Sequence, residues 1–229
     1  MSTPTRSIGG NRSLDNKSRD FFFLKRYDAN VIISICIQLI RQKLPKYVNA
    51  SPFDIQVLTP MRKGLLGVER LNTILQQYLN PPDAKKAEHE HGQTIFRVGD
   101  KVMQIRNNYE KEIFNGDIGT VESVDLQERM LKVNFDQHII EYEASELDEL
   151  VHAYATTIHK AQGSEYPIVV MPVLMNHYVM LQRNLIYTGI TRAKKALVIV
   201  GTRKALSYAI RNVTVTKRNT FLKERLSQA

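Results

Sequence analysis

The chain has 229 residues, of which 43% are hydrophobic, and it carries a formal net charge of +9. This length allows one large domain, or one domain plus a small one, and the composition is that of an ordinary water-soluble protein. The longest apolar stretch, residues 31–40, is too short to span a bilayer, so we expect no membrane segment. The single cysteine, Cys36, excludes an internal disulfide and suits a reducing cytoplasm, where we expect the protein to act.

Strands and helices are predicted to alternate in the first part of the chain. Residues 1–20 have no apolar run, and we expect a flexible arm there. The predicted elements that follow are a strand at 21–26, a helix over 31–40, a strand at 54–60 and a helix at 67–80. Asp28 can cap the first helix, which we expect to end before Pro45. The β-α-β-α order is typical of a parallel sheet with crossover helices, so residues 21–94 are predicted to form a first α/β segment.

A different rhythm begins after residue 80. Residues 81–94 are polar, and we expect a solvated linker; its His89 and His91 have no nearby third ligand, so no metal site is predicted. Short strands separated by turns follow at 96–105, 116–125, 130–135 and 138–147. Four or five short strands in about 55 residues are typical of a small SH3-like β-barrel, which is predicted over 95–149.

The α/β pattern returns at residue 150. The predicted elements are strands at 151–155 and 166–174, a helix at 179–193, a strand at 196–202 and a helix at 203–212. We therefore predict an α/β fold in which residues 21–94 and 150–229 share one parallel sheet, with the barrel inserted between them.

Charge is sorted along the sequence. Between residues 166 and 223 there is no Asp or Glu, whereas the stretch holds ten basic residues: Arg183, Arg192, Lys194, Lys195, Arg203, Lys204, Arg211, Lys217, Arg218 and Lys223. Residues 133–159 have the opposite bias, with six acidic side chains and no Lys or Arg. This pattern indicates either a polyanionic partner for the C-terminal part or a solvated basic surface, and the charges alone leave both open.

Two polar motifs interrupt the predicted core. The first, "TTIHKAQGSE" at 156–165, leaves the carboxyl end of a predicted strand, which is where parallel sheets bind ligands. Its hydroxyls, Lys160, the backbone amide of Gly163 and the carboxylate of Glu165 suit phosphate and sugar groups. In the second motif, Arg192 ends a predicted helix just before a strand, from which an arginine can reach an anion across a cleft. The alternative for each residue is plain loop or helix-cap chemistry.

These motifs resemble those of superfamily-one helicases. "ATTIHKAQGSEY" is similar to motif V and "LIYTGITRAKKALVIVG" to motif VI of the second motor domain. The stretches "IQVLTPMRKGLLGVERLN" (55–72) and "FRVGDKVMQIRNNYEKEIFNGDIG" (96–119) resemble the RecD branch, the exodeoxyribonuclease V alpha subunit family. The resemblance runs from about residue 21 to the end. It implies a RecA-like, P-loop-NTPase-type second motor domain with an inserted SH3-like barrel.

The resemblance also implies a function and roles for single residues. The chain would be the C-terminal motor half of an ATP-dependent 5'-3' DNA helicase acting in recombination and repair. Arg192 would be the arginine finger that meets the γ-phosphate, while Gly163 and Glu165 would lie near the phosphates and ribose and Gln162 would link the two sites. The residues expected to face single-stranded DNA are Thr157, His159 and Lys160 in motif V, Arg62 and Lys63 after a strand end, and Arg106, Asn108 and Tyr109 in the barrel. For Tyr109 and the nearby Phe114, a place in the barrel core is the open alternative.

One departure from the family pattern limits what the chain is expected to do alone. No G-x-x-x-x-G-K-[ST] occurs in the 229 residues, and no strand ends as a Walker B motif does. We therefore expect ATP and Mg²⁺ to be held mainly by an N-terminal motor domain, and the isolated chain to be inactive and free of cofactors. Expected partners are single-stranded DNA, that motor domain and RecB- and RecC-like subunits. The alternative is a single-stranded nucleic-acid-binding or subunit-docking module without turnover.

Overall fold

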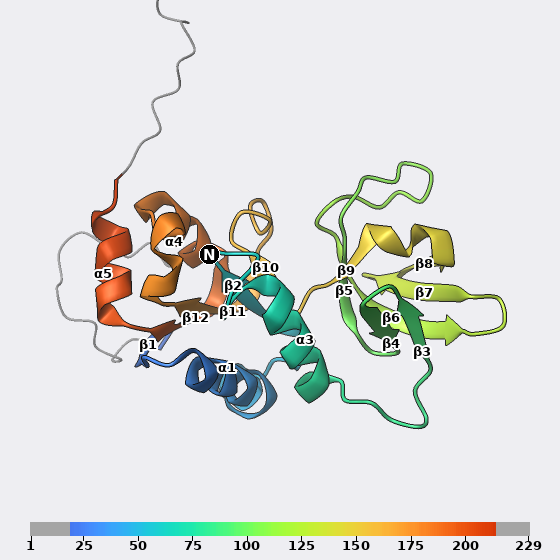
Figure 1. The fold of residues 1–229 in the computed structure, drawn as a ribbon, viewed down its shortest axis with the longest axis horizontal. Coiled ribbons are helices and arrows are strands. Elements are labelled where there is room, and N and C mark those ends of the chain that lie inside the picture. The colour runs from blue at the N-terminus through green and yellow to red at the C-terminus, as the bar shows by residue number, and fades with distance from the viewer. Residues whose placement is uncertain (1–18, 214–229) are drawn as a thin grey trace, which may run out of the picture.

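The computed structural model describes residues 19–213, in which a parallel sheet flanked by helices is joined to a smaller antiparallel unit (Figure 1). We call these the parallel-sheet domain and the antiparallel domain (residues 88–152). Nearly all of the flexible arm expected at 1–20 lies outside the described residues, as do Lys217, Arg218 and Lys223 of the basic stretch.

The parallel sheet confirms the predicted α/β class. Its strands, in spatial order, are β1 (Phe21–Lys25), β12 (Ala193–Gly201), β11 (Tyr166–Val173), β2 (Ile55–Thr59) and β10 (Ala155–Thr157), and every neighbouring pair is parallel. The sheet is covered on one face by α1 (Ala29–Gln38) and α3 (Val68–Leu79), and on the other by α4 (Arg183–Ile190) and α5 (Arg203–Arg211). Buried apolar strands with helices on both faces are typical of a parallel sheet.

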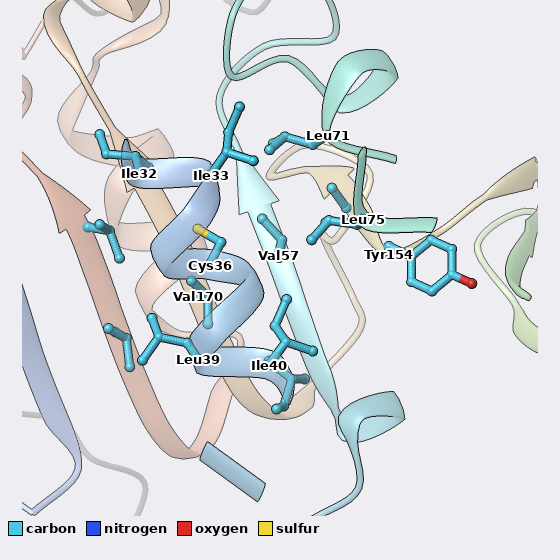
Figure 2. Packing of buried hydrophobic residues seen from close by; sticks show 14 of the residues in the cluster. Ile32, Ile33, Cys36, Leu39, Ile40, Val57, Leu71, Leu75, Tyr154 and Val170 are labelled. Carbon is cyan, nitrogen blue, oxygen red and sulfur yellow. The ribbon is translucent and has the colours of Figure 1, made fainter. Parts of the chain in front are cut away.

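Helix α1 supplies much of the core on its face of the sheet. Figure 2 shows Ile33, Cys36 and Ile40 directed at Val57 of β2, with Leu75 of α3 closing the cluster from the side. All five are essentially buried, and burial raises the pKa of the Cys36 thiol from 9.0 to about 12, so the thiol stays protonated at neutral pH. The helix was predicted from Val31, Ile32, Ile35, Leu39 and Ile40, of which Val31 is exposed in the structure and Ile35 only partly buried.

The helix prediction was wrong at the end of α1. Asp28 caps the helix by accepting from the backbone amides of Asn30 and Val31, as expected. The helix does not end before Pro45 but continues as a π-helical turn, Leu39–Lys43, into α2 (Leu44–Val48). Pro45 lies in the first turn of α2, directly after the π-helical turn.

The antiparallel domain is built from the short strands predicted for a barrel. Its sheet runs β8 (His138–Glu143), β7 (Met130–Phe135), β6 (Ile118–Asp125), β5 (Lys101–Gln104) and β9 (Leu150–His152), with the 3-10 segment Ala144–Glu149 before β9. Phe96, Leu131, Val133 and Tyr142 lie in its separate hydrophobic core.

Three further predictions of local structure need correction. Part of the linker forms a hairpin of β3 (Glu88–His91) and β4 (Thr94–Arg97), because Gly92 makes the turn at φ +59° and Arg97 pairs with Glu88 at 2.6 Å. The run 151–155 is split between two sheets, since β9 pairs with β5 and β10 pairs with β2. The helix predicted over 179–193 is shorter, because a 3-10 segment at Met175–Met180 precedes α4.

Within residues 19–213, no three His, Cys, Asp or Glu side chains are grouped so that they could hold a metal ion, and His91 instead pairs with Asp148 at 2.8 Å. None of the helices in that range is long and apolar enough to cross a membrane.

Candidate functional site

The loop at 158–165 joins β10 to β11 and displays most of motif V. Its backbone folds into successive turns, with the Ala161 amide donating to the Thr157 carbonyl at 3.1 Å and the Lys160 amide donating to Thr157 Oγ1 at 3.2 Å. Ile158 and Ala161 are fully buried and anchor the loop on the domain core. The residues left exposed between and beyond these anchors are His159, Lys160, Gln162, Gly163 and Glu165. The two buried residues therefore hold the exposed polar groups of the loop in defined positions.

The first end of this loop lies at the carboxyl edge of the sheet, beside the loop that follows β2. Thr157 pairs in register with Thr59, the last residue of β2, and Arg62 and Lys63 follow within four residues. The pKa of Lys160 is lowered, first by burial and then by the positive charge of Arg62, which places these two cations near each other. Arg62 is held at 2.9 Å by Glu69 of α3, on a well-exposed surface. The arrangement concentrates positive charge where an anionic backbone would be attracted.

Lys63 of the same loop borders a small cavity of about 60 Å³ together with His177. Burial lowers the pKa of His177 to about 4, so this side chain is neutral at physiological pH and adds no charge to the edge. Arg62, Lys63 and Lys160, all three predicted from the sequence, therefore supply the positive charge at the carboxyl ends of β2 and β10.

The other end of the loop lies at the amino edge of the sheet, where β11 and β12 begin, and meets Arg192 there. The Arg192 guanidinium donates from Nη1 to the carbonyl of Ser164 at 2.9 Å, from Nε to the carbonyl of Thr188 at 3.2 Å, and from Nη2 to Thr191 Oγ1 at 3.2 Å. Three of its five N–H donors are thus used and two remain. Arg192 ties the end of helix α4 to the end of motif V.

Arg192 is placed there because α4 approaches the sheet closely. Gly189, three residues before Arg192, packs so near β11 that a Cβ atom built on it would lie 2.8 Å from the sulfur of Met171. Only glycine allows this approach without a shift of its neighbours. Close packing of the helix end therefore fixes the position of the arginine that follows it.

Glu165 is the second charged group at the amino edge. Lys194 Nζ lies 2.9 Å from its Oε2, and this hydrogen bond is the largest cause of a lowered pKa for Glu165, followed by the charges of Lys194 and Arg192. The structure thus brings Glu165 and Arg192 together, and it adds Lys194, which the sequence analysis counted only in the basic stretch. Lys194 follows Arg192 by two residues into a strand, so the period of two was the available signal. Nothing in the sequence indicated that Arg192 would donate a hydrogen bond to the backbone carbonyl of Ser164.

The residues predicted in the antiparallel domain lie on an ordered loop between β5 and β6. An isolated bridge joins Asn108 and Ile113, and their backbone hydrogen bonds measure 2.8 and 3.0 Å. Tyr109 is 76% exposed and packs edge to face on Phe114 with ring centroids 6.0 Å apart, whereas Ile113 is buried. The alternative that the two rings belong to the barrel core is therefore wrong; Arg106 is also exposed.

Two family models match this chain. Residues 71–135 match the SH3 domain of ATP-dependent RecD-like DNA helicases, and residues 152–200 match the UvrD-like helicase C-terminal domain. The second match contains the loop at 158–165 and Arg192.

Individual proteins agree with these matches. The chain is 41% identical over 177 residues to the ATP-dependent RecD2 DNA helicase of Deinococcus radiodurans, which covers 76% of this chain and 24% of that protein. It is 31% identical over 160 residues to the RecBCD enzyme subunit RecD of Haemophilus influenzae, covering 69% of this chain and 23% of that protein. The chain thus spans about a quarter of the length of these curated relatives.

Among solved structures, a Pif1 helicase studied for DNA unwinding at forked double-stranded DNA aligns with a TM-score of 0.51 at 14% identity, covering 90% of this chain and 53% of that one. This likeness concerns the fold. The family models and the RecD relatives support a RecD-like helicase C-terminal region that includes an SH3-like domain.

Proposed function

We propose that this chain supplies the second motor domain and the SH3-like domain of an ATP-dependent DNA helicase that moves 5'-3' and acts in recombination and repair. The observation that carries the proposal is the loop at 158–165. The first end of the loop carries Lys160 and lies beside Arg62, and the other end is hydrogen-bonded to Arg192. A single short segment therefore connects two groups of charged side chains at opposite edges of the sheet. A motor that couples hydrolysis to movement on DNA needs such a connection between two ligands.

The amino-edge group would meet ATP that is held, together with Mg²⁺, mainly by an N-terminal motor domain. Arg192 has two N–H donors left for the γ-phosphoryl oxygens, and charge stabilisation is the main need of phosphoryl transfer. Glu165 is exposed and can accept from a ribose hydroxyl. Gly163 has φ +87° and open space around its Cα, so its backbone amide is accessible to a phosphate. Gln162, exposed between the two ends, is proposed to respond to both ligands.

The carboxyl-edge group would hold one strand of DNA. Arg62, Lys63 and Lys160 would neutralise phosphates, with Thr157 and His159 donating or accepting at the sugar-phosphate backbone. The exposed Tyr109 ring offers a stacking surface, flanked by Arg106 and Asn108, in the antiparallel domain. RecB- and RecC-like subunits are proposed partners because several relatives are RecBCD subunits, and the single cysteine supports action in the cytoplasm.

The test separates the two groups in the complete protein that contains this chain. Arg192→Ala should reduce ATP turnover by on the order of 10³–10⁵-fold and leave single-strand affinity, measured without nucleotide, nearly unchanged. Lys160→Ala should weaken DNA binding and the stimulation of turnover by DNA more than the basal rate. Arg211→Ala, an exposed change in the last turn of α5, is the control. Loss of DNA binding with intact turnover in Arg192→Ala would overturn the assignment.

The second candidate is a single-strand-binding or subunit-docking module without turnover. It is favoured by the exposed aromatic pair and the cations, which need no nucleotide to bind DNA. The isolated chain should bind single-stranded DNA but hydrolyse no ATP, since we propose that the phosphate cradle and magnesium site belong to the N-terminal motor domain. Restoration of DNA-stimulated turnover by adding that domain would favour the motor, and its absence would favour the module.

A further inference from the structure

Two adjacent charged residues are buried where the antiparallel domain meets the parallel-sheet domain. Asp100 is 0% exposed and Lys101 is 4% exposed, and both stand at the start of β5. Burying a charge is costly unless hydrogen bonds compensate it. The groups that surround these two side chains therefore define how the domains are joined.

Helix α3 of the parallel-sheet domain donates to the Asp100 carboxylate. Gln76 Nε2 lies 2.6 Å from Oδ2, and Asn80 Nδ2 lies 2.7 Å from Oδ1. Gln76 lies in the last turn of α3 and Asn80 is the residue that follows the helix, so the carboxyl end of α3 is held to Asp100 by two amides. Both amides are themselves buried, so water cannot replace the carboxylate as their hydrogen-bond acceptor.

Groups of the antiparallel domain, and Tyr154 in the link to β10, complete the environment of the carboxylate. Oδ2 accepts the Arg97 backbone amide at 2.8 Å and faces His152 Nε2 at 3.2 Å, while Oδ1 accepts the Tyr154 hydroxyl at 2.8 Å. Burial alone would raise the pKa of Asp100, but the hydrogen bonds from His152 and Asn80 outweigh it and hold the pKa below the ordinary value of 3.8. One ionised carboxylate thus joins α3, the end of β4, β9 and the link to β10.

Lys101 points to the parallel-sheet domain from the next position. Its Nζ donates to the carbonyl of Phe53 at 2.8 Å and lies 4.7 Å from the centre of the Phe53 ring. A second tie holds the chain where it crosses between the sheets, because Asn72 of α3 donates to the His152 carbonyl at 2.7 Å and accepts the Ala155 amide at 2.7 Å. Domains within one chain move relative to each other by default, but directional bonds on several elements allow only one orientation.

We propose that Asp100 is a positioning residue that locks the antiparallel domain onto the parallel-sheet domain. The Tyr109 loop is thereby held at a fixed place relative to Arg62 and Lys160, so one DNA strand can engage both. The inference that one DNA strand engages both regions rests on the proposed function, whereas the lock itself does not. Asp100→Asn keeps the size of the side chain but replaces one acceptor oxygen by a donor that faces other donors, so it should release the lock.

The lock is tested without DNA by spin labels on Leu126→Cys and Lys204→Cys, two exposed positions in the two domains of the full 229-residue chain. Cys36 is buried with a raised pKa, so it should escape labelling. Double electron–electron resonance should give one narrow distance for the parent and a broad distribution for Asp100→Asn. The control Asp136→Asn, at an exposed position in the turn after β7, should keep a narrow distribution. A broad distance distribution in the parent chain, or a narrow one in Asp100→Asn, would overturn the proposal.

The DNA part is tested with fluorescent oligo(dT) of about 5 and about 16 nucleotides, lengths that bracket one or both contact regions. The parent should bind the long probe at least tenfold more tightly, and Asp100→Asn should lose this advantage while keeping its affinity for the short one. Equal length dependence in both would refute the shared strand. Failure of both probes to bind the parent would reject the proposed function and leave the lock to the distance measurement. If Asp100→Asn does not fold, as judged by circular dichroism, Tyr154→Phe, which removes one donor, takes its place.

Discussion

Replacing Lys101 by methionine should abolish the dependence of stability on pH between about pH 7 and pH 8.5. Burial lowers the pKa of this amine from 10.5 to about 7, so within that window the unfolded chain holds a proton that the folded chain has lost. The free energy of unfolding therefore rises with pH, because stability increases wherever the unfolded state binds more protons. Below pH 7 both states are protonated and the dependence vanishes.

The size of the effect follows from the two pKa values. Each pH unit within the window contributes up to about 1.4 kcal/mol, and integration from pH 7 to pH 8.5 gives about 1.5 kcal/mol. Two other groups contribute little within the window. His177, whose pKa is lowered to about 4, completes its contribution at about pH 7.5, and Cys36, whose pKa is raised to about 12, begins to lower stability at about pH 8, so each changes stability within the window by only about 0.2 kcal/mol, with opposite signs.

Urea unfolding followed by circular dichroism measures this at several pH values. The parent chain should gain stability across the window, and Lys101→Met should be flat. Lys204→Met changes the same side chain at an exposed position on α5 and should keep the parent's slope. If the free energy of unfolding of the parent did not change with pH, or if Lys101→Met kept the same pH dependence, the Lys101 amine would have to be hydrated. That result would contradict its hydrogen bond to the Phe53 carbonyl.

Three other changes have defined outcomes. Gly189→Ala brings a Cβ within 2.8 Å of the sulfur of the buried Met171, so it should lower the free energy of unfolding by about 1–3 kcal/mol in thermal or urea melts; an unchanged stability would mean that the Met171 side chain shifts to make room. Tyr109→Ala should alter stability by less than about 0.5 kcal/mol and weaken single-strand affinity by about 1–3 kcal/mol in titrations, and unchanged affinity would remove the ring from the DNA path. Single-strand affinity of the isolated chain should fall with salt by roughly 0.7 logarithmic units per tenfold salt for each phosphate neutralised, and a flat response would exclude a phosphate track.

The elements with simple periodicity were predictable. The apolar spacing in α1 and the polar residue before it indicated a capped helix, and short β-branched runs indicated buried parallel strands. The carboxyl-end rule placed the first half of motif V correctly, beside Arg62. It did not place the second half, because the loop crosses to the amino edge and delivers Glu165 there.

Other features depend on contacts that no local pattern encodes. The run 151–155 is apolar apart from His152 and Tyr154, so nothing in it marks the point at Ala153 where the chain passes from one sheet to the other. Lys101 follows a Gly-Asp turn and reads as a solvent-exposed strand residue. Its buried amine is held by the backbone carbonyl of Phe53, nearly fifty positions earlier. Every residue has a backbone carbonyl, so the sequence does not show which one a lysine will contact.

The order of strands in the parallel sheet has a consequence for synthesis on the ribosome. β12 and β11 lie between β1 and β2, so β1 has no partner until residues 193–201 are made, and β2 has none until β10 follows the antiparallel domain. The antiparallel domain, whose strands pair only among themselves and whose core is its own, is complete by residue 152 and can fold first. The nascent chain must therefore carry two unpaired apolar strands past a finished domain. Such strands are prone to aggregation, which makes this interval the point at which chaperones would be needed most.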